Sequence, residues 1–269
     1  MFLCPKCRAL LVEEERRAVC QNNHSFDRAR EGYYNLLISN TALHGDNKEM
    51  VAARRAFLLK GFYRPLADRI AELALKYVTV GDALVDFGSG EGYYTDIVER
   101  ALYEARGESR VYGFDISKDA VRAAAKGNKR VHYAVASAYH TPFADGAFAV
   151  ALNLFSPLAR EEVERLLSPG GIFIMAIPDV MHLYELKAQI YDNPYKNTVE
   201  DTALSGFELI TDEPLSYDML LSDNETVQSL FKMTPYAYRT KRSDAEKINS
   251  LDSLKVRASF RILVYRRNK

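Results

Sequence analysis

One stretch decides the fold: Val85-Asp86-Phe87-Gly88-Ser89-Gly90-Glu91-Gly92-Tyr93-Tyr94-Thr95, a buried strand with an acidic residue, a glycine-rich turn and the start of a helix. Glycines at alternate positions let the backbone turn sharply and come close to a bound ligand that a side chain would exclude. Asp115 lies 25 residues after Gly90, at the end of the next apolar run, 111–114. Because a doubly wound fold has its ribose-binding carboxylate at about this distance, the spacing predicts an adenosine-containing cofactor.

Two cofactors compete for this loop. A nicotinamide site uses the spacing G-x-G-x-x-G and binds a pyrophosphate at a helix N-terminus. Here the spacing is G-x-G-x-G, and the carboxylate of Glu91 would repel a pyrophosphate. S-adenosylmethionine has no phosphate, and its amino-acid end is cationic at both the amine and the sulfonium, which suits Glu91 and Asp86. We therefore predict an S-adenosylmethionine site formed by Asp86, Gly88, Gly90, Glu91, Gly92, Asp115 and Ile116.

From residue 83 the chain alternates strands and helices. The expected strands are 83–87, 110–114, 131–135, 147–153 and 171–177, and the expected helices are 93–105, 118–127, 160–167 and 182–191. Strands separated by helices of this length indicate βαβ units and a parallel sheet, so the predicted fold class is α/β and Rossmann-like. The last apolar run, 260–265, is expected to be an isolated strand at a sheet edge.

Segments after the later strands support a class I methyltransferase. Residues 166–174, Leu-Leu-Ser-Pro-Gly-Gly-Ile-Phe-Ile, resemble the loop and strand that open the fifth strand of such enzymes. Ser137 follows the third strand, where these enzymes hold the adenine, and residues 153–157 follow the fourth strand, which faces the target atom. The run Asn-Leu-Phe-Ser-Pro at 153–157 differs from the N-P-P-Y signature of exocyclic-amine methyltransferases. No cysteine follows Cys20, which disfavours a C5-pyrimidine nucleophile.

All three cysteines fall within the first 20 residues, at Cys4, Cys7 and Cys20, and His24 follows one short turn later. Three thiolates and an imidazole form a complete tetrahedral ligand set for structural Zn²⁺, with no position open for water. The alternatives are cysteines incidental to a short arm, or a redox C-x-x-C motif, which normally lies at a helix start. A module of this size has too little core to fold without such a metal, so we predict a structural zinc site.

The net charge of zero hides segments of opposite sign. Residues 1–60 carry a net charge of +3, residues 61–231 carry −11 and residues 232–269 carry +8. The basic ends, together with Arg54 and Arg55, favour contact with phosphates of a polyanion, although a solvated basic tail would have the same composition. Apolar runs stay shorter than the roughly 18 residues of a membrane span, and no signal-peptide pattern opens the sequence, so a cytoplasmic location is expected.

Several segments match one family pattern. They are the Cys4/Cys7/Cys20/His24 set and the runs at 31–37 (Glu-Gly-Tyr-Tyr-Asn-Leu-Leu), 53–58 (Ala-Arg-Arg-Ala-Phe-Leu), 90–95, 182–187 (His-Leu-Tyr-Glu-Leu-Lys) and 233–236 (Met-Thr-Pro-Tyr). In this combination the chain resembles the bacterial 23S rRNA guanine-N1 methyltransferases over nearly its whole length. The resemblance implies a zinc module joined to a class I methyltransferase domain with a mostly parallel, seven-stranded sheet. It also implies a homodimer that acts on a guanine in a 23S rRNA hairpin near the peptide tunnel, at the macrolide site, and not on DNA or a membrane.

The resemblance also assigns site residues. The equivalents of Tyr63, Gly90, Glu91 and His182 touch the cofactor in that family, and Ser89 replaces a cysteine that is often found between the glycines. Without the resemblance, Tyr63 is equally a core aromatic residue, and His182 is equally a core or helix-capping residue.

The region before the glycine loop is expected to cover the cofactor mouth. Residues 39–47 form a predicted polar linker, and helices are expected over 48–60 and 67–77. The expected regions are 1–37 as a zinc-binding RNA-recognition module, 38–80 as linker and covering helices, and 81–269 as the class I methyltransferase domain.

Methyl transfer to a guanine requires positioning of an in-line attack and removal of one proton. Guanine N1 carries a hydrogen and lies inside paired stems, so the base must be unpaired or flipped out. Asn153, which also lines the cofactor site, and Phe155 are expected to hold the base, although Phe155 is equally a core aromatic residue. The candidate general bases are Asp179, His182 and Glu185.

Two rival functions stay open at this point. One is a small-molecule methyltransferase with a zinc-ribbon decoration, and the other is an RNA-binding protein that does not catalyse a reaction. The resembling family also has two branches that modify neighbouring guanines, numbered 745 and 748, and the sequence does not choose between them.

Overall fold

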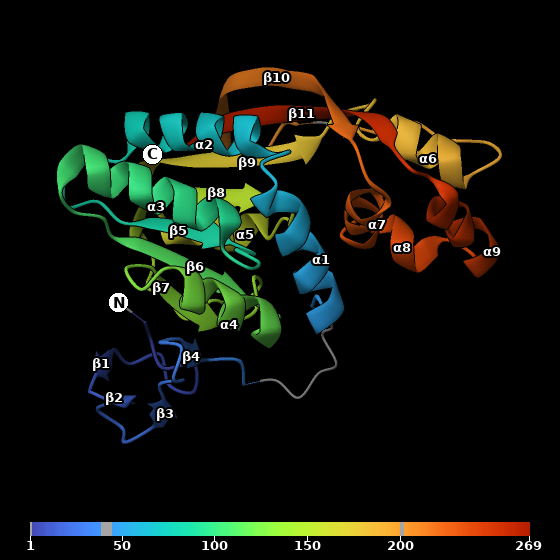
Figure 1. Ribbon diagram of the computed structural model, residues 1–269. Helices are drawn as coiled ribbons and strands as arrows, with labels where there is room; N and C mark the ends of the chain where they lie inside the picture. The colour runs from blue at the N-terminus through green and yellow to red at the C-terminus, as the bar shows by residue number, and fades with distance from the viewer. Residues whose placement is uncertain (1, 39–44, 200–201) are drawn as a thin grey trace.

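The computed structural model describes residues 2–38, 45–199 and 202–269, so most of the predicted linker, 39–44, lies outside the described residues. The centre is a sheet in which the described strands have the order β10-β11-β9-β8-β5-β6-β7-β4 (Figure 1). The inner strands are β5 (Leu84–Phe87), β6 (Val111–Asp115), β7 (His132–Val135), β8 (Phe148–Leu154) and β9 (Leu167–Pro178). They pair in parallel, as the alternation of strands and helices predicted.

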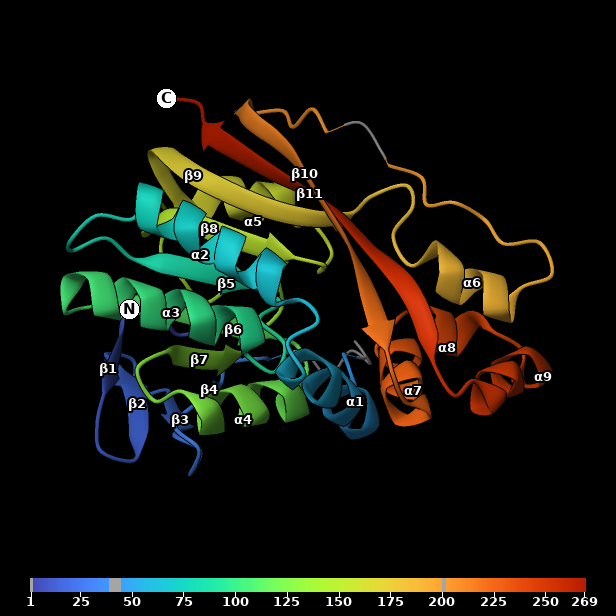
Figure 2. The same ribbon diagram turned by 45° about the horizontal axis from the view of Figure 1, so that its top comes forward.

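Helices and the N-terminal module cover the two faces of this sheet (Figure 2). Successive strand residues point to opposite faces, so Leu84 and Val85 belong to different cores. The Leu84 core includes side chains of α2 (Arg64–Tyr77), α3 (Tyr93–Arg106) and α4 (Lys118–Gly127). The Val85 core includes side chains of α5 (Arg160–Leu166) and of the N-terminal module. Both faces are therefore dry, as a parallel sheet requires.

An antiparallel pair, β10 (Phe207–Leu221) and β11 (Leu254–Arg267), completes the sheet. β11 lies between β9 and β10, so the expectation of an edge strand at 260–265 is wrong. The edge is β10, which the sequence did not predict because it contains Pro214 and many acidic residues. Those acids pair across to β11, as Asp212 does with Arg261, and this long-range pairing leaves no local sequence signal.

Short helices form a lobe at the far end of β10 and β11 (Figure 1). They are α6 (Tyr184–Ile190), α7 (Asn224–Lys232), α8 (Tyr236–Arg239), α9 (Arg242–Ala245) and a 3-10 turn (Glu246–Ser250). α6 begins two residues later than predicted, because Leu183 has a left-handed backbone conformation with φ 54°. His182 therefore lies in the turn before the helix, not within it.

The N-terminal module packs directly against the main domain. It has its own antiparallel sheet of β1 (Leu11–Glu13), β2 (Arg17–Cys20) and β3 (Ser25–Asp27). The next strand, β4 (Tyr34–Asn35), leaves this sheet and pairs in parallel with β7. The described part of the main sheet therefore has the seven strands that the resemblance implied and one further strand from the module.

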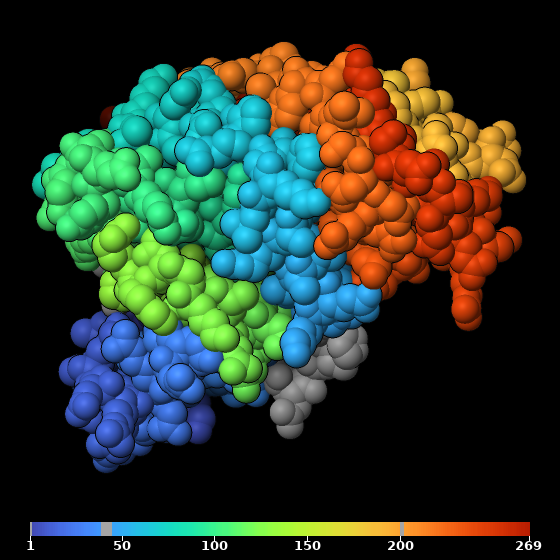
Figure 3. Space-filling view, viewed as in Figure 1, coloured from blue at the N-terminus to red at the C-terminus, as the bar shows by residue number. Residues whose placement is uncertain are grey.

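Helix α1 (Lys48–Leu59) connects the sheet to the C-terminal lobe. The side chain of Asn47 caps it by accepting a hydrogen bond of 3.0 Å from the backbone N–H of Met50. Figure 3 shows this helix between the segment that contains α4 and the segment that contains α7. Within the described ranges, none of the helices has the length and apolar character that a bilayer crossing requires.

The Phe2 ring gives a direct test of how the module is held. It packs at centroid distances of 6.0 Å from Tyr34, 5.8 Å from Tyr112 and 5.3 Å from Phe143. We expect Phe2→Ala to lower the free energy of unfolding by about 3–5 kcal/mol, because it leaves a cavity between module and domain. Leu10→Ala, at a side chain that is 58% exposed, is the control and should cost less than about 0.5 kcal/mol. Equal losses in chemical denaturation would contradict this packing role.

Candidate functional site

The carboxyl ends of the parallel strands bring the predicted site residues to one edge of the sheet. The glycine loop follows β5, and Asp115 ends β6. Ser137 follows β7 and is half-buried, while Asn153 lies at the end of β8. Ile116 lies beside the chain at Gly45, where an added Cβ would be only 2.7 Å from the Ile116 side chain. Ligands of open α/β sheets bind at this edge, as the sequence predicted.

The glycines of the loop have different roles. Gly88, Gly90 and Gly92 have φ values of 69°, 55° and 84°, which L-residues with side chains rarely adopt. A Cβ at Gly88 would lie 2.4 Å from the Ser156 side chain, and one at Gly92 would lie 2.7 Å from the Tyr133 hydroxyl. At Gly90 the nearest contact would be a guanidinium nitrogen at 3.9 Å. Gly88 and Gly92 therefore satisfy internal packing, whereas at Gly90 the left-handed backbone angle alone favours glycine.

The carboxyl groups around this loop outnumber the positive charges that could balance them. Asp86 is buried; one oxygen accepts a hydrogen bond of 2.6 Å from Thr95 Oγ1, and the other has no partner among the described residues. Burial raises the pKa of Asp86 to about 7 and the pKa of Glu91 to about 7. Asp115 accepts backbone N–H bonds from Gly90 at 3.0 Å and Ser117 at 2.8 Å, and burial raises its pKa as well. A cationic ligand would supply the opposite charge, which fits the amine and sulfonium of S-adenosylmethionine.

The structure brings Arg54 to the glycine loop, although the sequence assigned it to RNA phosphates, and the charge of Arg55 also acts on Glu91. It forms an ion pair with Asp46 and donates a 3.4 Å hydrogen bond to the carbonyl of Met233. Its charge opposes the rise in the pKa of Glu91. Its guanidinium thus has two partners within the chain, one of them 179 positions away with no local signal, and a contact of Arg54 with RNA phosphates stays a prediction.

An aromatic cluster forms the other wall of the site. The Phe260 ring lies 5.1 Å from Tyr63, 4.7 Å from His182 and 5.5 Å from Phe155, measured between centroids. The Tyr94 ring lies 6.2 Å from Phe155 and joins this cluster to the glycine loop. Tyr94 and Phe260 were not predicted as site residues, because aromatic residues in helices and strands usually serve the core. The Tyr94 hydroxyl is shielded from solvent and has no hydrogen-bond partner among the described residues.

His182 is held by both ring nitrogens. Its Nδ1 accepts a 3.2 Å hydrogen bond from the backbone N–H of Ser259, so Nε2 carries the hydrogen and lies 3.4 Å from the Tyr63 hydroxyl. Burial, aided by the charge of Lys187, lowers the pKa of His182 to about 3. His182 is therefore neutral at physiological pH and orients Tyr63.

The segment after β8 presents a strained, exposed ring. Phe155 has φ 65°, and its side chain is 41% exposed. Ser156 Oγ donates a 2.8 Å hydrogen bond to the carbonyl of Phe87, and Asn153 Nδ2 donates one of 3.3 Å to the carbonyl of Pro157. These bonds fix the loop against β5. Residues held in such backbone conformations cluster at functional sites.

Two carboxylates follow β9. Asp179 accepts a 3.3 Å hydrogen bond from Ser259 Oγ, and Glu185 accepts one of 3.0 Å from the backbone N–H of Arg257. Both groups are half-buried and bond to residues of β11, as His182 does.

The four predicted zinc ligands converge as the sequence predicted. Their ligand atoms lie within 4.8 Å of one another. Cys4 Sγ and Cys20 Sγ lie 3.4 Å and 3.5 Å from His24 Nδ1, and Cys7 Sγ lies 3.6 Å from Cys20 Sγ. These are close to the edges of a tetrahedron with zinc–ligand bonds of about 2.0–2.3 Å. A hydrogen bond from the backbone N–H of Ala9 lowers the pKa of Cys7 to about 6, which favours its thiolate. The donor set fits Zn²⁺.

Comparison with known proteins covers both parts of the chain. A zinc-ribbon family model described as "RlmA, N-terminal" matches residues 2–40, and a model described as "Methyltransferase domain" matches residues 79–233. A 23S rRNA (guanine(748)-N(1))-methyltransferase of Streptomyces fradiae is 42% identical over 68% of this chain and 65% of its own length, so the matched part is slightly less than two thirds of that relative. A Micromonospora griseorubida protein, provisionally named a 23S rRNA (guanine-N1)-methyltransferase, is 32% identical over 98% of this chain and 96% of its own length.

The chain belongs to the 23S rRNA (guanine-N1)-methyltransferase family. The predicted fold class and the predicted cofactors, S-adenosylmethionine and structural zinc, are confirmed. A solved Bacillus halodurans protein, provisionally described as a methyltransferase, has the same fold, with a TM-score of 0.51 and 14% identity. The match covers 76% of this chain and 99% of the chain of that protein.

Replacement of Glu91 tests the electrostatics of this family member. Because folding raises the pKa of Glu91 from 4.5 to about 7, its ionisation lowers stability as the pH rises through this range. We expect Glu91→Gln to stabilise the cofactor-free protein by roughly 1–3 kcal/mol at pH 8, by less at pH 5, and to weaken S-adenosylmethionine binding at both. Denaturation curves and calorimetry measure these effects. Glu104→Gln, at an exposed position of α3, is the control. A loss of stability at pH 8 would contradict the buried, uncompensated charge.

Proposed function

We propose that this chain methylates N1 of a guanine in 23S rRNA, the reaction that the names of its relatives give for those proteins. The main support for this proposal is Phe155, which has an exposed ring and a left-handed backbone conformation. It lies beside the buried Asn153, at the sheet edge that carries the methyl-donor loop. An exposed aromatic ring there offers a stacking surface for an unpaired base.

Two polar groups near this ring suit the edge of guanine. Guanine presents the O6 acceptor beside the N1–H donor. The Tyr94 hydroxyl, shielded from solvent and without a partner in the described structure, would donate to O6 once the base displaces the groups that cover it. Asn153 already donates through Nδ2, which leaves its carbonyl oxygen to accept from the base. This pair would favour guanine over adenine, because adenine has an amino group in place of O6.

The protein has to hold the base and accept its N1 proton. S-adenosylmethionine supplies an activated methyl group on its sulfonium. His182 is a poor proton acceptor, because both ring nitrogens are engaged and its pKa is lowered to about 3. We assign it to cofactor positioning with Tyr63. Asp179 is the proposed base, since its carboxylate is half-buried and, among the described residues, accepts a single long hydrogen bond from a hydroxyl. Glu185 is the second candidate.

RNA binding is proposed for the basic ends of the chain. Exposed cations lie on the zinc module at Arg16, Arg28 and Arg30, and near the C-terminus at Arg239, Lys241 and Arg242. Phosphate contacts of this kind predict an affinity that falls steeply with salt. We also propose that the substrate is an rRNA hairpin and that the protein is a cytoplasmic homodimer. The proposed regions are 1–37, 38–80 and 81–269, as predicted from the sequence.

Mass-spectrometric mapping of 23S rRNA from a deletion strain tests the reaction. We expect one N1-methylguanine to be lost and to return with the wild-type gene, and the position lost identifies the branch. A full complement of N1-methylguanine in the deletion strain would contradict the proposal. Methylation of a free metabolite without rRNA methylation would instead support a small-molecule enzyme, and a lack of S-adenosylmethionine binding would support a non-catalytic RNA-binding protein.

Phe155→Ala tests the stacking surface. Because base–aromatic stacking contributes about 1–3 kcal/mol, we expect kcat/KM for an rRNA hairpin to fall by roughly 5- to 150-fold. S-adenosylhomocysteine affinity should change less than about twofold. The matched control is Phe155→Tyr, which retains the ring and should retain most activity. Equal activity of Phe155→Ala and wild type would exclude the ring from substrate binding.

A further inference from the structure

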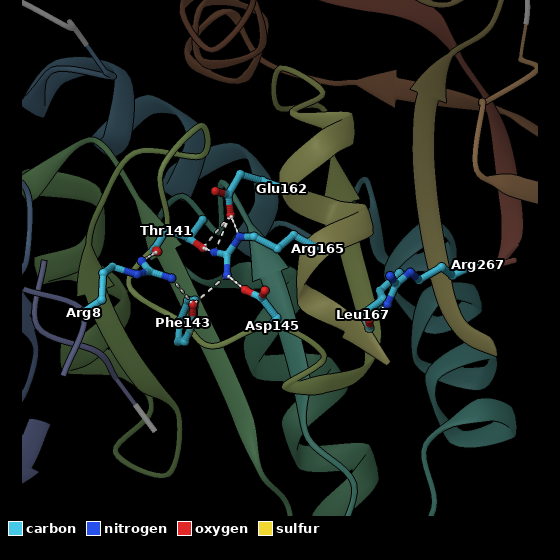
Figure 4. Close-up of polar contacts among 8 residues, drawn as sticks. All are labelled: Arg8, Thr141, Phe143, Asp145, Glu162, Arg165, Leu167 and Arg267. Atoms are coloured by element: carbon cyan, nitrogen blue, oxygen red, sulfur yellow. Dashed lines mark hydrogen bonds and ion pairs between the residues drawn. The ribbon is translucent and has the colours of Figure 1, made fainter. Parts of the chain in front are cut away.

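The turn that carries the zinc ligands Cys4 and Cys7, here called the zinc knuckle, is followed by Arg8, whose long side chain bonds to the main domain. Arg8 directly follows the ligand Cys7 and has φ 62°, and its backbone N–H donates a 2.7 Å hydrogen bond to the carbonyl of Cys4. Its guanidinium donates to the backbone carbonyls of Thr141 and Phe143, both at 2.7 Å (Figure 4). The knuckle therefore sets the direction of this side chain.

A second arginine holds the same two residues from the opposite side and shares the carbonyl of Phe143 with Arg8. Arg165 of α5 donates to the carbonyl of Phe143 at 2.9 Å and to Thr141 Oγ1 at 3.1 Å, and ion pairs with Glu162 and Asp145 support it. Figure 4 shows Arg8 and Arg165 converging on this loop. The carbonyl between them, that of Pro142, accepts a 2.7 Å hydrogen bond from the backbone N–H of Leu3. Three consecutive carbonyls thus accept hydrogen bonds from the zinc module, two of them from Arg8 and one from Leu3.

The loop in question is continuous with the cofactor edge. Residues 136–147 connect β7 to β8 and begin with Ala136, whose N–H donates a 3.0 Å hydrogen bond to the carbonyl of Asp115, and with Ser137, the predicted adenine contact. The Phe143 ring packs 5.3 Å from Phe2 of the module and 6.0 Å from Phe114, the neighbour of Asp115. One short segment therefore touches the zinc module at its far end and the cofactor edge at its start.

We propose that Arg8 is a positioning residue that couples zinc binding to S-adenosylmethionine binding. The knuckle backbone depends on the metal, because so small a module has little core of its own. Loss of zinc would release the Arg8 backbone and its two hydrogen bonds, and the loop that carries Ser137 would lose its support. Coupling between two binding sites is reciprocal, so the cofactor must also tighten zinc binding. The inference rests on the cofactors of the family and not on the identity of the methylated base.

Calorimetry with S-adenosylhomocysteine on the full-length chain tests the first direction. We expect zinc-loaded Arg8→Met to bind it about 5- to 10-fold more weakly than wild type, and chelator-treated wild type to be weakened at least as much. The matched control is Lys6→Met, which removes an exposed cation of the same knuckle and should bind as wild type does. Arg8→Lys, which can reach one carbonyl, should be intermediate.

The rate of zinc transfer to a chromogenic chelator tests the reverse direction. Saturating S-adenosylhomocysteine should slow zinc loss from wild type several-fold and leave zinc loss from Arg8→Met unchanged. The coupling would be overturned if Arg8→Met bound S-adenosylhomocysteine as tightly as wild type does. It would also be overturned if S-adenosylhomocysteine did not change the rate of zinc loss from wild type. If chelation unfolds the chain, as circular dichroism would reveal, the zinc-loaded Arg8→Met comparison decides. Absence of S-adenosylhomocysteine binding in every form would overturn the cofactor assignment itself, whereas a wrong base assignment would leave these results unchanged.

Discussion

Three carboxyl groups, buried at Asp86 and Glu91 and half-buried at Asp115, surround one glycine-rich turn, and much of the remaining structure follows from this constraint. Burial raises the pKa of each group, and the charge of Arg54, itself paired with Asp46, only partly opposes this rise at Glu91 and Asp115. The cofactor-free site therefore carries an electrostatic cost that a cationic ligand relieves. The same feature that identified the methyl donor in the sequence explains how the folded chain selects it.

The opposite wall of the site is neutral by construction. His182 is buried, both its nitrogens are engaged, and its neighbours are the rings of Tyr63 and Phe260. A charged acid cluster on one side and a neutral aromatic wall on the other suit a ligand whose cationic end is small and whose target is a flat base. Phe155 and Tyr94 lie where these two walls meet.

The sequence predicted what local chemistry determines. Alternate glycines indicate unusual backbone angles, so the loop and the inner strands beside it were predictable. Four zinc ligands within 21 residues can bind one metal ion, so the zinc site was predictable as well. It could not predict contacts between distant segments. Arg54 bonded to Met233, Arg8 bonded to the loop at 141–143, and β11 inserted between β9 and β10 each join positions that are far apart in sequence. β10 was missed because Pro214 and its acidic residues obscure the apolar alternation.

We infer that buried, partly protonated carboxyl groups become ionised when the cationic cofactor binds. Calorimetry of S-adenosylmethionine binding at pH 7, in two buffers of different ionisation enthalpy, measures the protons exchanged. Since Asp86 and Glu91 both have pKa values raised to about 7, we predict a net release of roughly half a proton or more per cofactor bound. No net exchange, or a net uptake of protons, would contradict the ionisation of these carboxyl groups on cofactor binding.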